Sequence, residues 1–372
     1  MKKIENLCIE GRIMISIQEF KEKCVCGQLL QKSKYVLKHK KQKIAKKIDK
    51  YIGWLARWMW SKRVKVSENK ILFLTFNKQY TCNPKYICQE LIKKNIDCDI
   101  VWLVNSEKSF SHSPFPARIR RVQIGTAKAF YELLTAKIII ENAYLSQEMG
   151  YTPIQKEQYL IQTWHGSLVI KRFGPEYDSI KSRVLAAKRA GNYTDLFLSN
   201  STFETKEVAS VFWENAEIRE WGHARNDLLI CQRYNIKQEV RIRLGIPVNF
   251  RIALYAPTYR DEKSRDHYQL NYNKLIEALS KRFGGEWIVL IKLHYSMRNY
   301  TLNLKTNPYI KDVSKYSDIQ ELMLITDVGI TDYSSWIFDF LLTGKPAFIY
   351  ADDIYLYEDE RGFYYPLSTT PF

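Results

Sequence analysis

The chain has 372 residues, of which 46% are hydrophobic and 26% charged, with 15 Gly and 11 Pro; this composition is typical of globular proteins with two domains and excludes a low-complexity chain. Seven cysteines are scattered without a C-x-x-C pair, so the sequence predicts neither a disulfide framework nor a zinc site, and reduced thiols in a cytosolic compartment fit best. No apolar run reaches the length of about 18 residues that a membrane-spanning helix needs, and we find no secretory signal.

The formal net charge of +17 is concentrated at the N-terminus. Residues 1–65 hold 18 Lys and Arg against 5 Asp and Glu, a net charge of +13, which leaves +4 for the other 307 residues. From residue 41 to 65, apolar residues recur at helical spacing and end in Trp54, Trp58 and Trp60. A basic amphipathic helix of this kind can lie in a membrane interface. The alternatives are packing on the next domain, nucleic-acid binding, which the rest of the chain does not favour because it shows no reading motif, and a solvated basic arm.

After residue 66, apolar strands alternate with helices. The expected strands are 71–76, 100–104, 137–140, 159–163 and 195–199, and the expected helices are 84–94, 126–134, 180–189 and 202–212, with a polar loop at 109–121. A second series gives a helix at 237–244 and strands at 252–256, 287–291 and 347–350. Repeated β-α units predict parallel sheets with ligand sites at the carboxyl ends of the strands. We therefore expect an α/β fold that changes domain near residue 233.

The stretch from Ile325 to Pro346 predicts a strand, a tight polar turn and a helix. The turn places Ser334 and Ser335 at the helix N-terminus, where free amides and the helix dipole favour a phosphate. The simpler interpretation is a capping turn with Asp332 or Ser334 as the N-cap. Asp339 lies inside the apolar run of the helix, and a carboxylate in such a place usually has a partner.

Polar groups suited to a phosphorylated ligand follow successive expected strands. They are Trp164-His165-Gly166, Arg225, Pro257-Thr258 with Arg260, Lys292-Leu293-His294, and Ser334-Ser335 with Asp339. Each alone has an ordinary explanation, such as a hydrogen-bonded histidine or a surface ion pair. Their recurrence at strand ends in both halves favours a shared site. By contrast, Asp97-Cys98-Asp99 has the letters of a metal-binding D-x-D motif but precedes a strand, so we interpret it as a surface turn.

Several of these blocks also carry a resemblance to a known family. They are Gln162 to Gly166, Gly222 with Arg225-Asn226-Asp227, Tyr255 to Asp261, Leu293-His294, Ile330 to Asp339, Lys345-Pro346 and Arg361-Gly362-Phe363. In order and spacing, the chain from about residue 70 onward resembles the CDP-glycerol glycerophosphotransferases of teichoic-acid synthesis. Three blocks depart from the family pattern: Ser167-Leu168 replaces Thr-Pro, His223-Ala224 replaces Tyr-Pro, and Tyr295 replaces Pro. The polyol of the donor could therefore differ from glycerol.

The resemblance implies a fold and a set of site residues. The fold would be glycosyltransferase-B-like with two Rossmann-like domains, an acceptor-side domain at 66–232 and a nucleotide-donor domain at 233–372, after the basic membrane-associating segment 1–65. The donor site would hold Trp164, His165, Gly166, Arg225, Pro257, Thr258, Lys292, Leu293, His294, Ser334, Ser335 and Asp339, with no metal and no cofactor. The family generally continues beyond the position of Phe372, so we also expect that the chain could be a natural short form or a truncated one, and truncation would threaten activity.

The resemblance implies transfer of a polyol phosphate, most simply glycerol phosphate, from a CDP-activated donor to a hydroxyl of a lipid-linked or polymer acceptor, with release of CMP. The place would be the cytoplasmic face of the cell membrane, on an anionic lipid surface and without nucleic acid, in teichoic acid or capsule synthesis. A histidine is the best-suited base for such an attack because its pKa lies near neutrality. We assign His165 as the base and His294 to the phosphates. The competing hypotheses are a nucleotide-sugar glycosyltransferase of the same fold and an inactive membrane-bound remnant.

Overall fold

The structure is a computed structural model that describes residues 59–106, 115–145, 149, 154–167, 170–172, 181–231, 234–258, 270–294 and 307–370. The chain divides into one unit up to Lys62 and a second from Arg63 to Phe372. Nearly all of the expected N-terminal helix lies outside the described residues; at its end, Met59 and Trp60 have exposed side chains. No helix of the described part is both long and apolar enough to cross a bilayer. The fold below is that of the second unit.

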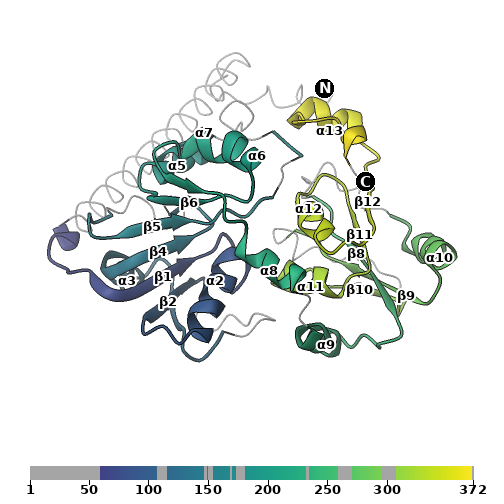
Figure 1. The fold of residues 1–372 in the computed structure, drawn as a ribbon, viewed down its shortest axis with the longest axis horizontal. Coiled ribbons are helices and arrows are strands. Elements are labelled where there is room, and N and C mark those ends of the chain that lie inside the picture. Colours follow the sequence, from purple (N-terminus) through teal and green to yellow (C-terminus); the bar gives the residue numbers. More distant parts are fainter. Residues whose placement is uncertain are drawn as a thin grey trace, which may run out of the picture. The chain divides into compact units, whose positions relative to one another are not determined.

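The first sheet of this unit is built from parallel strands in the order β3-β2-β1-β4-β5-β6-β7 (Figure 1). Their bounds are β1 Ser67–Leu74, β2 Asp99–Val104, β3 Arg120–Gln123, β4 Ala136–Glu141, β5 Tyr159–Gln162, β6 Leu196–Leu198 and β7 Glu217–Arg219. Along β1, Leu72 and Leu74 join one apolar cluster while Ile71 and Phe73 join another. The sheet is thus buried on both faces, which explains why its central strands appear as continuous apolar runs.

The second sheet repeats this arrangement with parallel strands in the order β10-β9-β8-β11-β12. Their bounds are β8 Arg251–Tyr255, β9 Trp287–Ile291, β10 Ile310–Asp312, β11 Val328–Thr331 and β12 Ala347–Ile349. Alternate residues of β8 again contact different clusters, with Leu254 in one and Tyr255 in the other. In both sheets the first strand lies in the middle and the chain reverses direction beside it, the order of doubly wound folds that bind ligands at that switch point.

Helices and short helical turns connect the strands or follow the last of them (Figure 1). They are α2 Cys82–Lys93, α3 Ala127–Thr135, α5 Lys181–Gly191, α6 Thr202–Glu204, the π-helical η2 Thr205–Ala209, α7 Ser210–Phe212, η3 Ala224–Asn226, α8 Asp227–Ile230, α9 Tyr234–Arg243, α10 Tyr272–Phe283, α11 Ile319–Ile325, α12 Trp336–Leu341, α13 Ile354–Arg361 and η6 Leu367–Thr369. The expected helix at 202–212 is therefore confirmed, but its middle turn is π-helical, a form that often marks functional sites.

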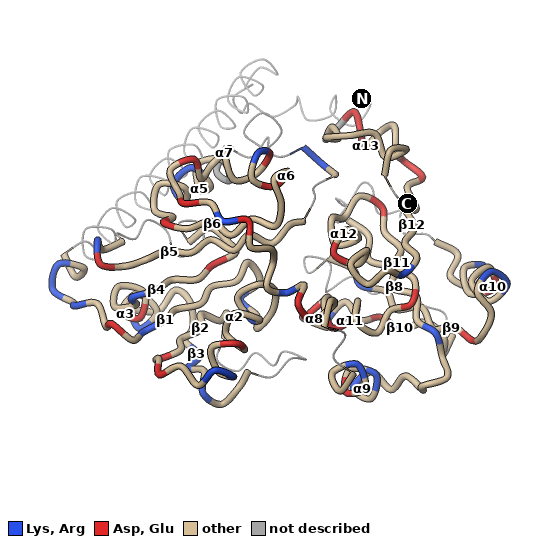
Figure 2. Tube along the Cα trace, viewed as in Figure 1, with Lys and Arg blue, Asp and Glu red and all other residues tan. Residues whose placement is uncertain are grey.

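The sequence predicted most of these elements within two or three residues. The prediction was wrong at 109–121, where the loop ends early because Arg120 begins β3. It also missed β7, β10, α10, α11 and α13. Of the Asp97-Cys98-Asp99 turn, Asp99 begins β2 and its carboxylate pairs with Arg120. Figure 2 shows both signs of charge spread over the described elements of this unit. This agrees with the low net charge outside residues 1–65.

A buried ionic cluster joins α2, which follows the first sheet's β1, to α11 beside the second sheet. Lys85 Nζ lies 2.5 Å from Asp318 Oδ2 and 2.6 Å from Glu321 Oε1, and the Lys85 side chain is 3% exposed. Burial alone would lower the pKa of Lys85, but the two carboxylates outweigh it and raise that pKa. The hydroxyl of Tyr86 donates to Asp318, and Arg243 binds the second oxygen of Glu321. The cluster is balanced in charge and well supplied with hydrogen bonds.

Replacing Lys85 by Ala should lower the free energy of unfolding by about 3–5 kcal/mol, because two buried carboxylates would lose their ammonium partner. Thermal or denaturant unfolding measures this. The matched control is Lys93→Ala on the same helix, whose partner Glu90 is 3.3 Å away and whose side chain is 65% exposed. The control should change stability by no more than about 0.5 kcal/mol. Equal effects of the two substitutions would contradict the account of this cluster.

Candidate active site

The loop after β5 holds the first predicted site residues in a strained backbone. Trp164 has φ +52°, a left-handed conformation that is rare for a bulky side chain and costs about 1–3 kcal/mol. Gly166 follows in close contact with it, since a Cβ there would lie 2.9 Å from the indole Nε1. The strained turn thereby presents His165 beyond the carboxyl end of the first sheet. Strain of this kind persists only where surrounding contacts fix it.

His165 is a neutral imidazole with a defined tautomer. Its Nδ1 lies 2.9 Å from the main-chain oxygen of Asn142, and since a carbonyl can only accept, Nδ1 carries the proton and Nε2 keeps a lone pair. The ring packs against Phe76 and Trp164 at centroid distances of 5.1 and 4.6 Å, yet the residue remains exposed to solvent.

The pKa of His165 is lowered to about 4. The largest cause is partial desolvation of the ring by its protein neighbours, and the positive charge of Arg225 adds to it. At neutral pH the lone pair of Nε2 is therefore available to accept a proton. The two predicted catalytic histidines follow β5 and β9 respectively, each beyond the carboxyl end of its strand.

Arg225 and Asp339 form the buried centre of the candidate site. The Nε of Arg225 donates to Asp339 Oδ2 at 2.9 Å, and its Nη2 donates to the carbonyl of Gly166 and the hydroxyl of Ser167, both at 3.0 Å. Both side chains are 4% exposed. Because the carboxylate lies against Arg225, the pKa of Asp339 is lowered even though burial acts to raise it.

Three more side chains complete the shell of Asp339. Ser167 donates to its Oδ1, Asn226 Nδ2 donates to the same oxygen at 2.8 Å, and Gln320 Nε2 donates to Oδ2 at 3.2 Å. The prediction that this buried carboxylate has a partner is confirmed, and its four partners come from three separate segments of the chain. Ser167, where the family pattern has Thr, keeps the hydroxyl that this shell uses.

The turn before α12 does not match the capping interpretation. Ser335 occupies the N-cap position and its side chain makes no capping hydrogen bond, so the expectation of Asp332 or Ser334 as the N-cap is wrong. Asp332 Oδ1 instead accepts from the amides of Thr258 and Tyr333 at 2.7 and 2.5 Å. It joins the end of β8 to the end of β11, and both serines remain half-exposed.

The strand ends of the second sheet contribute the other predicted residues. Leu293 is buried and its amide donates to Ser314 Oγ at 2.9 Å, while Lys292 Nζ donates to the carbonyl of Tyr316. Pro257 and Thr258 are buried, whereas His294 is exposed. Arg260 lies outside the described residues.

Solvent exposure thus separates the twelve predicted residues into two groups. His165 and His294 are exposed and Lys292, Ser334 and Ser335 are half-exposed, whereas the other seven are buried, namely Trp164, Gly166, Arg225, Pro257, Thr258, Leu293 and Asp339. The sequence prediction missed Asn83, Asn142, Ser167, Glu204 and Gln320. Of these, the sequence marked Asn83 only as a helix start, Asn142 only as the end of a strand and Ser167 only as a departure from the family pattern. No group of three or more potential metal ligands occurs in the described part of the chain.

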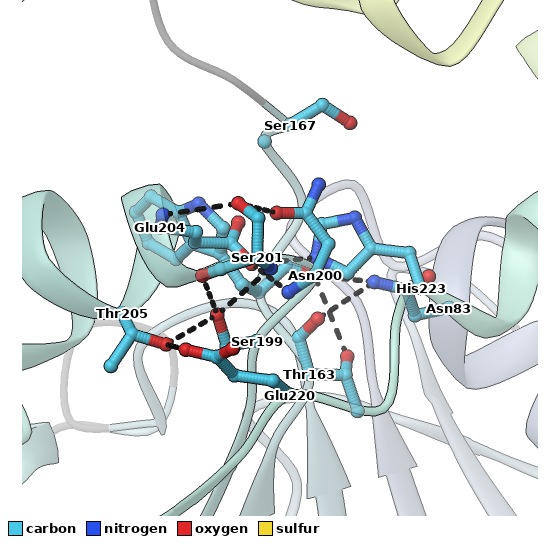
Figure 3. Close-up of polar contacts among 12 residues, drawn as sticks. Asn83, Thr163, Ser167, Ser199, Asn200, Ser201, Glu204, Thr205, Glu220 and His223 are labelled. Carbon is cyan, nitrogen blue, oxygen red and sulfur yellow. Dashed lines mark hydrogen bonds and ion pairs between the residues drawn. The ribbon is translucent and has the colours of Figure 1, made fainter. Parts of the chain in front are cut away.

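A second buried pair lies beside this centre. Glu204 Oε2 is 3.1 Å from His223 Nε2, and both side chains are completely buried. The same carboxyl oxygen accepts from the amide of Asn200 at 2.6 Å (Figure 3). Burial raises the pKa of Glu204 to about 8 and lowers the pKa of His223 to about 3. At pH 7 the pair is therefore an uncharged carboxylic acid beside a neutral imidazole.

Comparison with known proteins agrees with this geometry. The model of the CDP-glycerol:poly(glycerophosphate) glycerophosphotransferase family matches residues 55–372. The chain is 32% identical over 315 residues to the teichoic acid glycerol-phosphate transferase of Staphylococcus aureus, covering 80% of this chain and 78% of that one. It is 29% identical over 365 residues to the teichoic acid poly(glycerol phosphate) polymerase of Bacillus subtilis, covering 91% and 47%. It therefore spans about half the length of that polymerase.

The wall teichoic acid polymerase TagF is similar in structure. A variant of TagF soaked with CDPG superposes with a TM-score of 0.72 at 27% identity, over 83% of this chain and 77% of that one. Unsoaked TagF superposes with a TM-score of 0.69. The parallel α/β architecture and the match of the family model place this chain in the CDP-glycerol glycerophosphotransferase family. The resemblance found in the sequence is confirmed.

Glu204 should make stability fall as pH rises from 6 to 8. Its pKa is about 8 in the folded chain against an ordinary 4.5, so the folded state holds a proton that the unfolded state has lost, and this contribution disappears as pH approaches 8. The expected loss between pH 6 and 8 is about 2 kcal/mol. His223 titrates below this range. Denaturant unfolding at several pH values measures the slope.

Glu204→Gln should remove most of this slope, because an amide does not titrate. The matched control is Glu220→Gln, an exposed carboxylate that accepts from Thr202 and Thr205 of the same helical segment. The control should keep the slope of the unsubstituted protein. An unchanged slope in Glu204→Gln would show that the carboxyl is ionised in the folded state.

Proposed function

We propose that the protein transfers a polyol phosphate, most simply glycerol phosphate, from a CDP-activated donor to a hydroxyl of a lipid-linked or polymer acceptor and releases CMP. The observation that carries this proposal is His165, a neutral and solvent-accessible imidazole with its Nε2 lone pair available. The family match supports the donor class. The names of the relatives support a role in teichoic acid or capsule-type polymer synthesis.

The chemistry follows from the donor. The acceptor hydroxyl attacks the β-phosphorus of the CDP-polyol, a new P–O bond forms, and the bond to the bridging oxygen of CMP breaks. His165 Nε2 takes the proton of the hydroxyl. Its pKa of about 4 leaves it neutral at the pH of the cell, and also makes it a weaker base than the near-neutral histidine expected from the sequence. The pyrophosphate charge needs fixed positive groups and donors, a role that we assign to His294, Lys292 and the amides of the Ser334-Ser335 turn.

The buried residues serve this chemistry indirectly. Arg225 already has its donors on Asp339, Gly166 and Ser167, so we propose that it acts on the donor through its positive field and by holding the loop of His165. The roles of Trp164, Gly166, Pro257, Thr258, Leu293 and Asp339 are to form the walls and supports of the donor site. No metal is required by this scheme.

The larger organisation is also a proposal. Residues 66–232 would form the acceptor-side domain and residues 233–372 the donor domain of a glycosyltransferase-B-like fold; the support is that each range contains one doubly wound sheet. Residues 1–65 would bind the anionic cytoplasmic face of the membrane, where a lipid-linked acceptor lies. Their net charge of +13 supports this.

A donor and acceptor screen tests the proposed function. The full chain is incubated with CDP-glycerol, CDP-ribitol or common nucleotide sugars and with lipid-linked or soluble polyol-phosphate acceptors, and the release of nucleotide and the product mass are measured. CMP release with growth of the acceptor by one or more polyol phosphates supports the proposal. Transfer of a sugar, or no reaction with any donor, contradicts it.

His165→Ala should lower turnover by about two to four powers of ten, the usual range when a general base is lost. The affinity for CDP-glycerol, measured by calorimetry, should change little because Nε2 acts on the acceptor. Thermal unfolding serves as the control for folding. A folded His165→Ala protein that turns over at the original rate would remove His165 from the role of base and make His294 the leading candidate.

A further inference from the structure

Asn83, near the start of α2, is completely enclosed beside the candidate site. It is 1% exposed. All of the hydrogen bonds that the structure shows for its side chain are made to residues outside α2. Its Nδ2 donates to the carbonyl of Thr163 at 2.7 Å and to the carbonyl of Trp164 at 3.2 Å (Figure 3). Its Oδ1 accepts from the main-chain amide of Arg225 at 3.2 Å. This orientation of the amide is the one that satisfies two acceptors and one donor.

These three bonds act on the strained turn that presents His165. Trp164 has φ +52°, and its amide donates to Gln162 Oε1 at 2.9 Å. Asn83 binds the two carbonyls that flank the Cα of Trp164, namely that of Thr163 before it and that of Trp164 itself. The peptide group that leads into His165 is therefore fixed by a side chain from another helix.

The same side chain also fixes Arg225 relative to this turn. The amide of Arg225 binds Asn83, while its guanidinium binds Gly166 and Ser167, on the far side of His165. His165 thus lies in a short segment that is bound on both sides: Asn83 binds the residues before it, and Arg225 binds the residues after it. Because Arg225 contributes to the low pKa of His165, the separation of the two groups affects the basicity of the imidazole as well as its position.

The geometry points to Asn83 as a positioning residue, which sets where the imidazole of His165 stands relative to Arg225 and to the reacting hydroxyl. This inference rests on the proposed function of His165. Asn83 touches no reacting atom, and its effect is exerted through the main chain of Thr163, Trp164 and Arg225. Displacement of a base from its working geometry by one ångström can cost a factor of about 100 in rate.

The test is Asn83→Asp in the full chain. The substitution keeps an oxygen for the Arg225 amide but replaces the donor to Thr163 and Trp164 by a second oxygen that their carbonyls repel. The expected result is a kcat lower by about 30-fold or more, with the dissociation constant of CDP-glycerol within about 3-fold of the original. Loss of a residue that binds the donor would instead raise the dissociation constant of CDP-glycerol and leave kcat nearly unchanged.

Gln158→Glu is the matched control. The Nε2 of Gln158 also donates to two main-chain carbonyls, those of Leu133 and Ala136 at 2.7 and 2.8 Å, and its Oε1 accepts from the amide of Gln155. Gln158 is 5% exposed and directly precedes β5, at the end of the strand away from His165. The control should lose stability as Asn83→Asp does, while the folded enzyme keeps kcat within about 2-fold.

An independent readout does not need turnover. The chain has 6 His, so nitrogen-15 spectra of histidine-labelled protein can resolve the imidazole of His165, assigned by its loss in His165→Gln. Asn83→Asp should shift the His165 signals and its titration midpoint, and Gln158→Glu should not. If Asn83→Asp does not fold, Asn83→Ala, which removes the donors without adding charge, is measured in its place.

The outcomes separate the inference from the proposed function. If the unsubstituted protein releases no CMP from any CDP-polyol, the proposed function fails, and the spectra alone decide the role of Asn83. Unchanged His165 signals in the Asn83 variant would overturn the inference. It would also be overturned if kcat fell no further than in Gln158→Glu, or if the loss of activity came from weaker donor binding.

Discussion

The candidate site depends on one buried ion pair, between Arg225 and Asp339. Arg225 follows the last strand of the first sheet and Asp339 lies on α12 beside the second, and their contact brings Gly166, Ser167, Asn226 and Gln320 into a single hydrogen-bonded cluster. A buried pair of this kind is not in itself strong evidence for stability, because desolvation offsets much of the attraction. Here its consequence is geometric: the loop that carries His165 is tied to the helix that follows the Ser334-Ser335 turn.

The residues around this pair differ in charge state and in solvent exposure, and these differences suggest different roles. Partial desolvation, with a smaller effect of the Arg225 charge, keeps His165 neutral, and Arg225 lowers the pKa of Asp339 so that the carboxylate stays ionised. Nearby, Glu204 and His223 are uncharged because desolvation by burial outweighs the opposing effects of Arg225 on Glu204 and of Asp339 on His223. The site can therefore keep a free base next to a fixed cation, since Arg225 binds the carbonyl of Gly166, the residue after His165. The groups with exposed or half-exposed side chains are the two histidines, Lys292 and the two serines of the turn, and these are the groups to which we assign the pyrophosphate and the hydroxyl.

The sequence predicted the parts of the fold whose signal is local. Long apolar strands such as 100–104 and 287–291 were placed correctly because both faces of each sheet are buried. Helix α10 was missed although Leu275, Ile276 and Leu279 recur at helical spacing after the cap Asn271, whereas β7 and β10 have only three residues each and no distinctive pattern. That Asp339 needed a partner was predictable from burial. That the partner is Arg225 was not, because 114 residues separate them.

Asn83 shows most clearly that local sequence patterns do not predict long-range contacts. With Pro84 after it, the residue matched a helix start, and α2 does begin at Cys82. Its side chain, however, makes none of the local bonds that this pattern implies and binds residues 80 to 142 positions away. At Asn83 the backbone follows the helix-start pattern but the side chain does not. This departure lies next to the candidate site, and departures from local sequence rules are common at functional sites.

The most direct test of the account is a crystal structure of His165→Gln with CDP-glycerol, since this variant should bind the donor without turning it over. The account predicts the β-phosphate within hydrogen-bond distance of His294 and the amides of the Ser334-Ser335 turn, with residue 165 directed at the face of the phosphorus opposite the CMP oxygen. A donor bound with its pyrophosphate away from these groups, or one that leaves residue 165 more than about 6 Å from the β-phosphorus with no room for a hydroxyl between them, would contradict it.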